Sequence, residues 1–326
     1  MRSSKRAAKW IAAVVILVFV LVFLDMALYP STFMRSDVHA VSEEPCDVLV
    51  MGTSLGKMGI DPDSLLAGTG YDGHNLCVGG EYPQDAYWLL QLALEKQDPK
   101  VLVYDVDPGY FMGQKEEGNN SLLFWHEFPF GRAKAAYFRD VLRDHGFRSL
   151  FFQYYEYPLQ SSLPRAKDSL SRRLTGDYSA AYFRTEMQEY HENGFIERFP
   201  VAPEDLPAMK RMDFSADGVA PENMEYLKKV IGLCREKGIT FVAVSMPVPE
   251  QSAAAYQENY EEAWDYFSAF LQSEGVPYYN FNREYGQSYS HRVDHYVDYD
   301  GHLNGDSARE FSGIFGGILR NAGLLP

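Results

Sequence analysis

A serine near the start of the chain, and a histidine beside two carboxylates near its end, have the residue types of a nucleophilic catalytic site. Ser54 follows a short apolar run, and His302 shares a late segment with Asp298 and Asp300. A serine hydroxyl becomes a good nucleophile when a neutral imidazole takes its proton, and that imidazole needs a carboxylate at its other nitrogen. Ser54 is therefore the candidate nucleophile, and His302 is the candidate base.

Either aspartate could orient the base. Asp300 is the first choice, because with one residue between it and His302 its side chain can reach the imidazole across a turn. Asp298 is the alternative, since it lies four positions before His302 and would need a helical or bulged path. The competing interpretation is structural: Ser54 could cap a turn, and His302 could be an ordinary surface histidine.

The elements that must position these residues alternate between strands and helices. The expected strands are 48–51, 75–78, 101–104, 240–245 and 276–281, and the expected helices are 84–96, 221–237, 253–273 and 307–320. Such alternation makes a parallel sheet with helices on both faces, and ligands bind at the carboxyl ends of its strands. Ser54, Gly80 and Asp107 all fall at such ends.

The middle of the chain, 108–220, is crowded with aromatic residues and lacks clean strand patterns. It is too long for a simple connection, so we expect a largely helical insertion whose aromatic residues mostly form core. The predicted organisation is a basic tail and signal-anchor helix at 1–29, followed by one domain at 30–326 that carries this insertion.

The first residues indicate a membrane anchor. Four basic residues within the first nine precede an uncharged run, 10–24, that continues to residue 29 with only Asp25 interrupting it. This length approaches the roughly 20 residues that span a bilayer, and the basic end should stay in the cytoplasm. A cleaved signal peptide is the alternative, but no small-x-small cleavage site precedes Pro30. We expect a single-pass cell-membrane protein whose catalytic domain is extracytoplasmic.

The net charge and the motifs limit the classes of ligand expected for this chain. The net charge of −15 argues against nucleic acid as a partner and favours a neutral glycan. His291, Asp294, His295 and Asp298 have the residue types of a metal site, but their segment has the composition of a solvated loop. The glycines near residue 70 lack the Lys-Ser/Thr of a phosphate loop. We therefore expect neither a metal nor a cofactor.

In order and context these motifs resemble those of the SGNH (GDSL-like) hydrolase and acyltransferase superfamily. Gly-Thr-Ser at 52–54 stands where that family has Gly-Asp-Ser, 75–80 stands where its second block ends in glycine, and His302 stands where its last block has histidine. The resemblance covers the chain after about residue 45, except the middle. Two features depart from it: the strand 101–104 leads into Asp-Val-Asp-Pro rather than the oxyanion-hole asparagine, and the residue three before His302 is tyrosine.

The resemblance implies a three-layer α/β/α, flavodoxin-like fold and acyl-serine chemistry, with the N–H groups of Ser54 and Gly80 as the oxyanion hole. The shorter Asp-x-His spacing of Asp300 is similar to the alginate O-acetylation branch, and the missing asparagine favours a slow esterase or a dedicated transferase. Anchored proteins of this kind act in teichoic-acid D-alanylation and exopolysaccharide O-acetylation beside membrane-bound O-acyltransferases. An O-acylated envelope glycan or polymer is thus the expected substrate, and such an acyltransferase is the candidate partner. The alternative is a non-enzymatic envelope or scaffold protein that retains the fold.

Overall fold

The core of the computed structural model, which describes residues 2–113, 125–142 and 162–326, is a five-stranded parallel sheet. Its strands lie in the order β2-β1-β3-β6-β7, which is the order of a flavodoxin-like doubly wound sheet. The strands are β1 (Val48–Met51), β2 (Gly73–Asn75), β3 (Val101–Asp105), β6 (Thr240–Ser245) and β7 (Tyr278–Asn280). The predicted fold class is confirmed.

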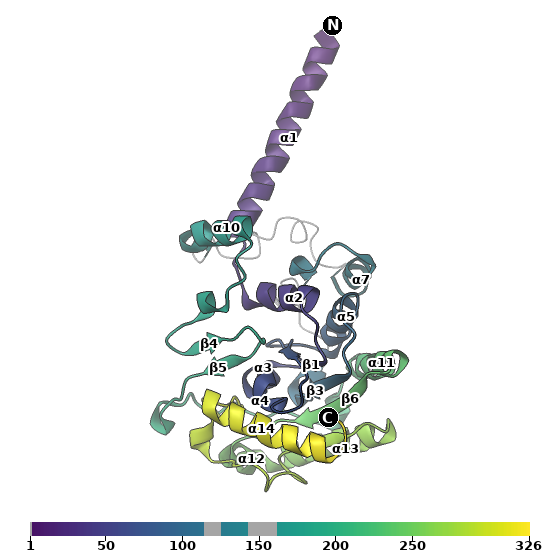
Figure 1. The fold of residues 1–326 in the computed structure, drawn as a ribbon, viewed down its shortest axis with the longest axis vertical. Helices are drawn as coiled ribbons and strands as arrows, with labels where there is room; N and C mark the ends of the chain where they lie inside the picture. Colours follow the sequence, from purple (N-terminus) through teal and green to yellow (C-terminus); the bar gives the residue numbers. More distant parts are fainter. Residues whose placement is uncertain (1, 114–124, 143–161) are drawn as a thin grey trace.

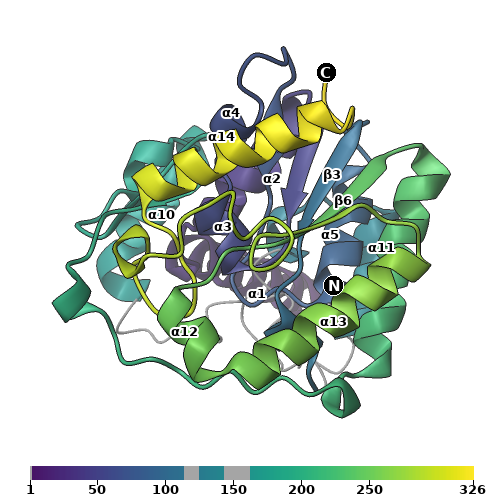
Figure 2. The same cartoon turned by 90° about the horizontal axis from the view of Figure 1, so that it is seen from below.

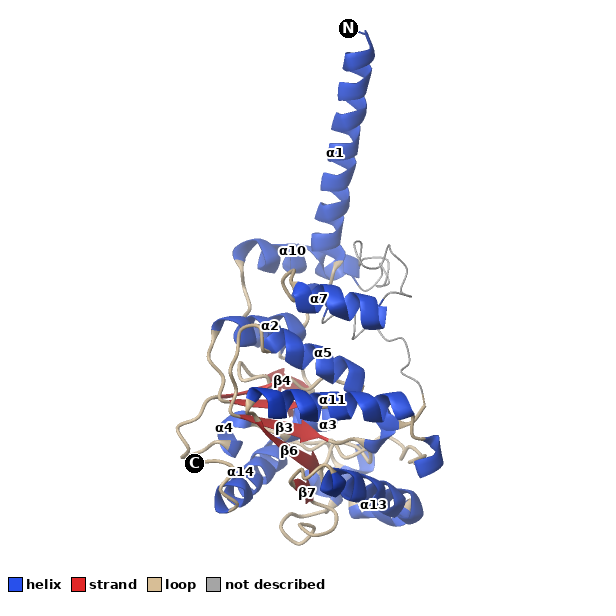
Figure 3. Cartoon of the chain, turned by 90° about the vertical axis from the view of Figure 1, so that its right-hand side faces the viewer, coloured by secondary structure: helices blue, strands red, loops and turns tan. Residues whose placement is uncertain are grey.

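Helices cover both faces of this sheet (Figure 3). The described α-helices that follow the amino-terminal one are α2 (Phe33–Glu43), α3 (Ser54–Gly59), α4 (Pro62–Leu65), α5 (Pro83–Ala93), α7 (Arg132–Tyr137), α10 (Ala166–Thr175), α11 (Pro221–Lys237), α12 (Glu250–Ala255), α13 (Gln257–Ser273) and α14 (Gly305–Asn321). Figure 2 shows β3 and β6 between α14 and α11.

Alternate residues of each strand enter opposite core layers. In β1, Leu49 and Met51 pack with apolar residues of α2, α5 and α11, whereas Val48 and Val50 pack with those of α4 and α14. This period of two follows from the pleat of a strand, and a strand covered on both faces is apolar at every position. All four residues of β1 are buried.

Most elements lie where the sequence predicts them, with differences at their ends. β1, β6 and α11 have the expected bounds. The ladder of β2 covers 73–75 rather than 75–78, although the N–H groups of Leu76 and Val78 still donate to carbonyl oxygens of β1 and Gly52. The expected helix at 253–273 begins earlier and is divided into α12 and α13 at Tyr256.

The described part of the predicted insertion contains short helices and one element that the sequence did not predict. β4 (Gln188–Tyr190) and β5 (Ile196–Arg198) form an antiparallel hairpin. Its turn packs on the edge strand of the sheet, because the N–H of Asn75 donates to the carbonyl of Asn193 at 2.8 Å. Trp125, Phe128 and Tyr137 are buried in the core, whereas the predicted aromatic segment 151–157 lies outside the described residues.

The amino-terminal helix α1 (Arg2–Leu28) projects away from the domain (Figure 1). Within it, the span Arg6–Leu28 contains an 18-residue stretch with a mean hydropathy of 3.0, and among the described residues this is the one helix long and apolar enough to cross a membrane. Its apolar side chains are exposed until the last turns, and Ala27 to Tyr29 are buried against the domain. The expected apolar helix is present, and its orientation across a membrane stays a prediction.

Candidate active site

The turn between β1 and α3 places Ser54 at the carboxyl edge of the sheet. Gly52 has a φ of +132°, and a Cβ atom added there would lie 2.6 Å from Cβ of Asp105. A Cβ atom added to Gly56 would lie 2.7 Å from Sγ of Cys77. Only glycine allows this approach and this φ without strain. The two glycines therefore let the first turn of α3, which begins at Ser54, pack directly on β3.

A tight hairpin presents the histidine. The N–H of Val297 donates to the carbonyl of His302 at 2.9 Å, so the chain reverses between these two residues. Inside the reversal, Oδ1 of Asp298 accepts the N–H groups of Asp300, Gly301 and His302 at 3.0, 3.1 and 3.2 Å. Gly301 has a φ of +110°, which the turn requires. The hairpin holds positions 298 and 302 side by side.

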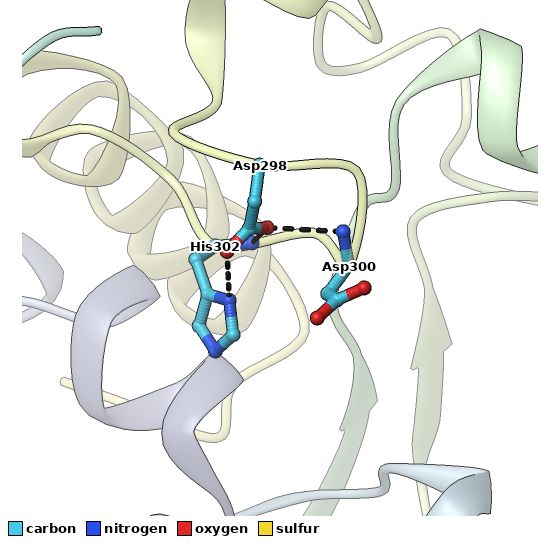
Figure 4. Close-up of side chains that lie close together, drawn as sticks. All are labelled: Asp298, Asp300 and His302. Carbon is cyan, nitrogen blue, oxygen red and sulfur yellow. Dashed lines mark hydrogen bonds and ion pairs between the residues drawn. The ribbon is translucent and has the colours of Figure 1, made fainter. Parts of the chain in front are cut away.

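Ser54, His302 and Asp298 form a continuous chain of hydrogen-bonded side chains. Nε2 of His302 lies 2.8 Å from Oγ of Ser54. Nδ1 of the same ring lies 2.6 Å from Oδ2 of Asp298, the contact drawn in Figure 4. Both distances are within the range that proton transfer and imidazole orientation require. The geometry can thus remove a proton from Ser54 through an imidazole whose tautomer is fixed by a carboxylate.

Asp300, the first choice of the sequence analysis, does not occupy the orienting position. Its carboxylate forms an ion pair with Lys210, and in Figure 4 the dashed line to the imidazole comes from Asp298. The expectation assumed that the shorter sequence spacing gives the shorter path. The closed hairpin brings residues 298 and 302 face to face, so the aspartate that is farther away in the sequence has the shorter path to the imidazole. The hydrogen bonds therefore favour Asp298, the alternative, and the catalytic roles stay predictions.

The environment keeps Asp298 charged. Burial opposes ionisation of this carboxyl, but the hydrogen bond with His302, the imidazole's charge when protonated and the backbone N–H groups together hold the pKa of Asp298 below its usual range. An ionised Asp298 is what an imidazolium at position 302 needs beside it.

A second pair of carboxyls lies beneath the nucleophile turn, at the end of β3. Oδ2 of Asp105 accepts the hydroxyl and N–H of Thr53 and the N–H of Gly56 at 2.9, 3.2 and 2.9 Å. The same hydroxyl lies 3.2 Å from Oδ2 of Asp107. A hydroxyl has one proton to donate, so both contacts are hydrogen bonds only when one carboxyl is protonated.

Burial accounts for such a proton. It raises the pKa of Asp105 to about 7, with the charge of Asp107 adding to the effect and the hydrogen bonds from Thr53 and Gly56 opposing it. Burial also raises the pKa of Asp107, against the N–H of Gly109 and the hydroxyl of Thr53. The sequence analysis placed Asp107 at a strand end but gave it no role, and its place in the third motif block was the available signal.

The second glycine block lies beside the nucleophile. Gly80 has a φ of +77°, and a Cβ atom added to Gly79 would lie 3.8 Å from Cβ of Ser54. Ser54 is the first residue of α3, so its N–H has no acceptor within that helix. The N–H groups of Ser54 and Gly80 stay the predicted oxyanion donors.

Ser54 and His302 line a pocket of about 420 Å³. Besides Ser54 and His302, its wall includes polar residues from 106–110 and 210–212 and an aromatic side formed by α13. On that side, Tyr260 and Trp264 stack with ring centroids 5.4 Å apart. The sequence analysis assigned neither these rings nor Lys210 to the site, because no local pattern connects α13 or residue 210 with Ser54.

The residues weighed as a metal site are engaged separately. His291 contacts the carbonyls of Val248 and Gly286, and Asp294 pairs with Arg292. Within the described part of the chain, the group whose ligand atoms come together is Asp298, Asp300 and His302, within 4.8 Å of one another. Asp298 binds His302 and the N–H of Asp300, His302 also binds Ser54, and Asp300 pairs with Lys210. The group therefore fits a chain of hydrogen bonds with a neighbouring ion pair.

Comparisons with known proteins give limited information about this chain. No family model matches it, and no curated protein matches it. Among solved structures, it is similar to a Bacteroides fragilis protein provisionally described as an acylhydrolase, with 9% identity and a TM-score of 0.38 over 86% of this chain and 88% of that one. The SGNH resemblance therefore stays a prediction from the motifs.

The two loop aspartates give a direct test of the site. We expect Asp298→Asn to slow covalent labelling of Ser54 by a fluorophosphonate by on the order of 10²-fold or more, because the amide cannot stabilise the imidazolium. The matched variant Asp300→Asn should label within about threefold of the wild type, since it removes only a partly exposed ion pair. Labelling rates measured on the two folded proteins decide between the carboxylates, and the opposite ranking would restore Asp300.

Stability should depend on the protonation of Asp105. The pKa of Asp105 is about 7 in the folded state and near 3.8 in the unfolded state, so the folded state holds the proton more tightly. The resulting stabilisation is complete below pH 4 and is lost as the pH rises through 7, by up to about 4 kcal/mol. Asp105→Asn should therefore show a flatter dependence of unfolding free energy on pH between 5 and 8 in urea titrations. Asp63→Asn, an exposed control, should follow the wild type, and identical slopes for wild type and Asp105→Asn would contradict the assignment.

Proposed function

We propose that this protein carries out acyl-serine chemistry on an O-acylated molecule, as an O-acyltransferase or an acylesterase. The observation that supports this most is the chain of hydrogen bonds from Ser54 through His302 to Asp298 at the mouth of a 420 Å³ pocket. The proposed nucleophile lies near the start of the sequence, and the proposed base and orienting carboxylate lie near its end. Their position at the carboxyl edge of the sheet, where ligands bind in such folds, supports these roles.

The residues divide the reaction into two steps. In the first, Nε2 of His302 takes the proton of Ser54 while Oγ attacks the acyl carbonyl, and the N–H groups of Ser54 and Gly80 receive the oxyanion. The imidazolium then protonates the leaving alkoxide, which departs as an alcohol and leaves the acyl group on Ser54. In the second step His302 removes a proton from water or an acceptor hydroxyl, whose oxygen attacks the acyl carbonyl. The imidazolium then gives that proton to Oγ of Ser54 as the acyl–serine bond breaks, which restores the free serine.

The substrate that we propose is an acylated glycan or polymer of the cell envelope. The stacked rings of Tyr260 and Trp264 give the pocket an apolar wall suited to the flat face of a sugar, and the net charge of −15 disfavours polyanions. With α1 in the membrane, the domain would work beside membrane-bound proteins, and an O-acyltransferase that supplies the acyl group is the proposed partner. A scaffold protein without turnover is the second candidate.

Covalent labelling separates enzyme from scaffold. We expect a fluorophosphonate to label the wild-type protein at Ser54 and to leave Ser54→Ala unlabelled, because only an activated serine reacts. Ser245 lines the same pocket and provides the matched control, so Ser245→Ala should still be labelled. Mass spectrometry of the labelled peptide identifies the site. A folded wild-type protein that resists labelling would favour the scaffold.

The acceptor of the acyl group distinguishes transfer from hydrolysis. Two features favour transfer: the walled pocket at Ser54, and the absence of the oxyanion-hole asparagine that SGNH proteins have. We therefore expect slow cleavage of p-nitrophenyl acetate that accelerates with an oligosaccharide acceptor. Mass spectrometry should then detect an O-acetylated oligosaccharide. Deleting the gene should lower the O-acyl content of an envelope polymer. Fast hydrolysis without acceptor, and higher O-acylation after deletion, would identify a deacylating esterase instead.

The domain that follows α1 is proposed to be extracytoplasmic. The basic residues before the apolar helix predict this orientation. Met187 is 66% exposed, and the three native cysteines are buried, so Met187→Cys offers one reactive thiol among the described residues. A membrane-impermeant maleimide should label this variant in intact spheroplasts. Labelling only after permeabilisation would reverse the orientation.

A further inference from the structure

A short helix of the middle segment is fastened to the end of α1. The guanidinium of Arg173, in α10, lies 4.4 Å from the centroid of the Tyr29 ring, and the guanidinium of Arg172 donates to Ser31 Oγ at 3.4 Å. α10 also contacts α1 itself, and Figures 1 and 3 both show it across the domain end of that helix. Tyr29 directly follows the last residue of α1, so α10 lies level with the end of the apolar helix.

One side of α10 packs on the domain through polar contacts. Ser169 and Arg172 are buried. The guanidinium of Arg172 stacks on Tyr182 at 4.1 Å and pairs with Asp177 at 3.0 Å. These contacts fix the rotation of the helix about its own axis, so its outer side has a defined direction.

The outer side is a stripe of leucines with one lysine. Leu163, in the 3₁₀ turn that leads into α10, is followed at intervals of four, seven and eleven residues by Lys167, Leu170 and Leu174. Residues at this spacing lie on one helix face. Leu163 and Leu174 are 64% and 69% exposed, and Lys167 is also exposed.

Such a face is unfavourable in water but suits the boundary between lipid headgroups and acyl chains. Burying an exposed leucine is favourable, and a lysine stem can bury its methylenes while its ammonium stays in the headgroup layer. Arg165 and Lys167, both exposed, add positive charge that anionic lipids attract, in a chain of net charge −15.

We propose that residues 163–175 form a second membrane contact, in which α10 lies in the interface of the bilayer that α1 spans and inserts Leu163 and Leu174. This rests on the proposal that α1 is membrane-spanning, and the occupant of the leucine stripe is lipid. A single spanning helix lets a domain rotate and tilt about it. A second contact beside it restricts both motions and holds the catalytic pocket at a set orientation to the membrane.

Depth measurements on the full chain test this contact. Single cysteines at Leu163, Leu174 and Met187 are labelled with bimane, in protein reconstituted into vesicles of phosphatidylcholine and phosphatidylglycerol. All three positions are similarly exposed in the protein, at 64%, 69% and 66%, so Met187→Cys is the matched control. We expect brominated lipid to quench the labels at 163 and 174 several-fold more than the label at 187, and aqueous iodide to show the opposite order.

Two outcomes would overturn the proposal. Equal quenching of all three labels by iodide would place the stripe in water, and protection from iodide without quenching by brominated lipid would show that protein covers it. A second set of variants tests the lipid contact without a label at either leucine. With bimane at Ser171→Cys, an exposed neighbour in α10, Leu163→Glu with Leu174→Glu should abolish lipid quenching, whereas Met187→Glu should leave it unchanged.

Discussion

The buried carboxyl of Asp105 organises the turn on which the candidate site depends. It accepts three hydrogen bonds from Thr53 and Gly56, and the two glycines of that turn allow the approach. Backbone donors at the start of a helix have no intrahelical acceptor, so an acceptor from the neighbouring strand satisfies donors that would otherwise be buried unpaired. Burial also raises the pKa of this carboxyl to about 7. Position and protonation at this turn are therefore linked.

A second buried network connects α3 with the part of the chain that lies next to α1. Asp37, on α2, accepts from Lys57 at 2.8 Å and from Tyr190 at 2.7 Å, and it lies 2.9 Å from Nε2 of His74. Lys57 is one turn after Ser54 on α3 and also donates to the carbonyl of Asn75. Burial opposes the charge of Asp37, but Lys57 and His74 hold its pKa below the usual range.

This network has a mechanical consequence. Removing one member of a buried, hydrogen-bonded ion pair leaves an uncompensated charge and commonly costs several kcal/mol, so α2, α3, β2 and the hairpin behave as one unit. α2 follows α1 closely, and α10 is attached at the same end of the domain. The apolar helix α1, the helices next to its end and the start of α3 are thus connected by buried contacts rather than by a flexible linker.

Local sequence determined much of this protein: the strands 48–51 and 240–245, the apolar amino-terminal helix, and Ser54 and His302 as candidates. Each of these depends on residues close together in the chain, through periodicity, length or motif spacing. Only the tertiary structure decided which carboxylate meets His302, because closure of the 297–302 hairpin outweighs sequence distance. It also placed Lys210 and Trp264 at the pocket, since sheet order and helix packing bring together residues that no local pattern relates.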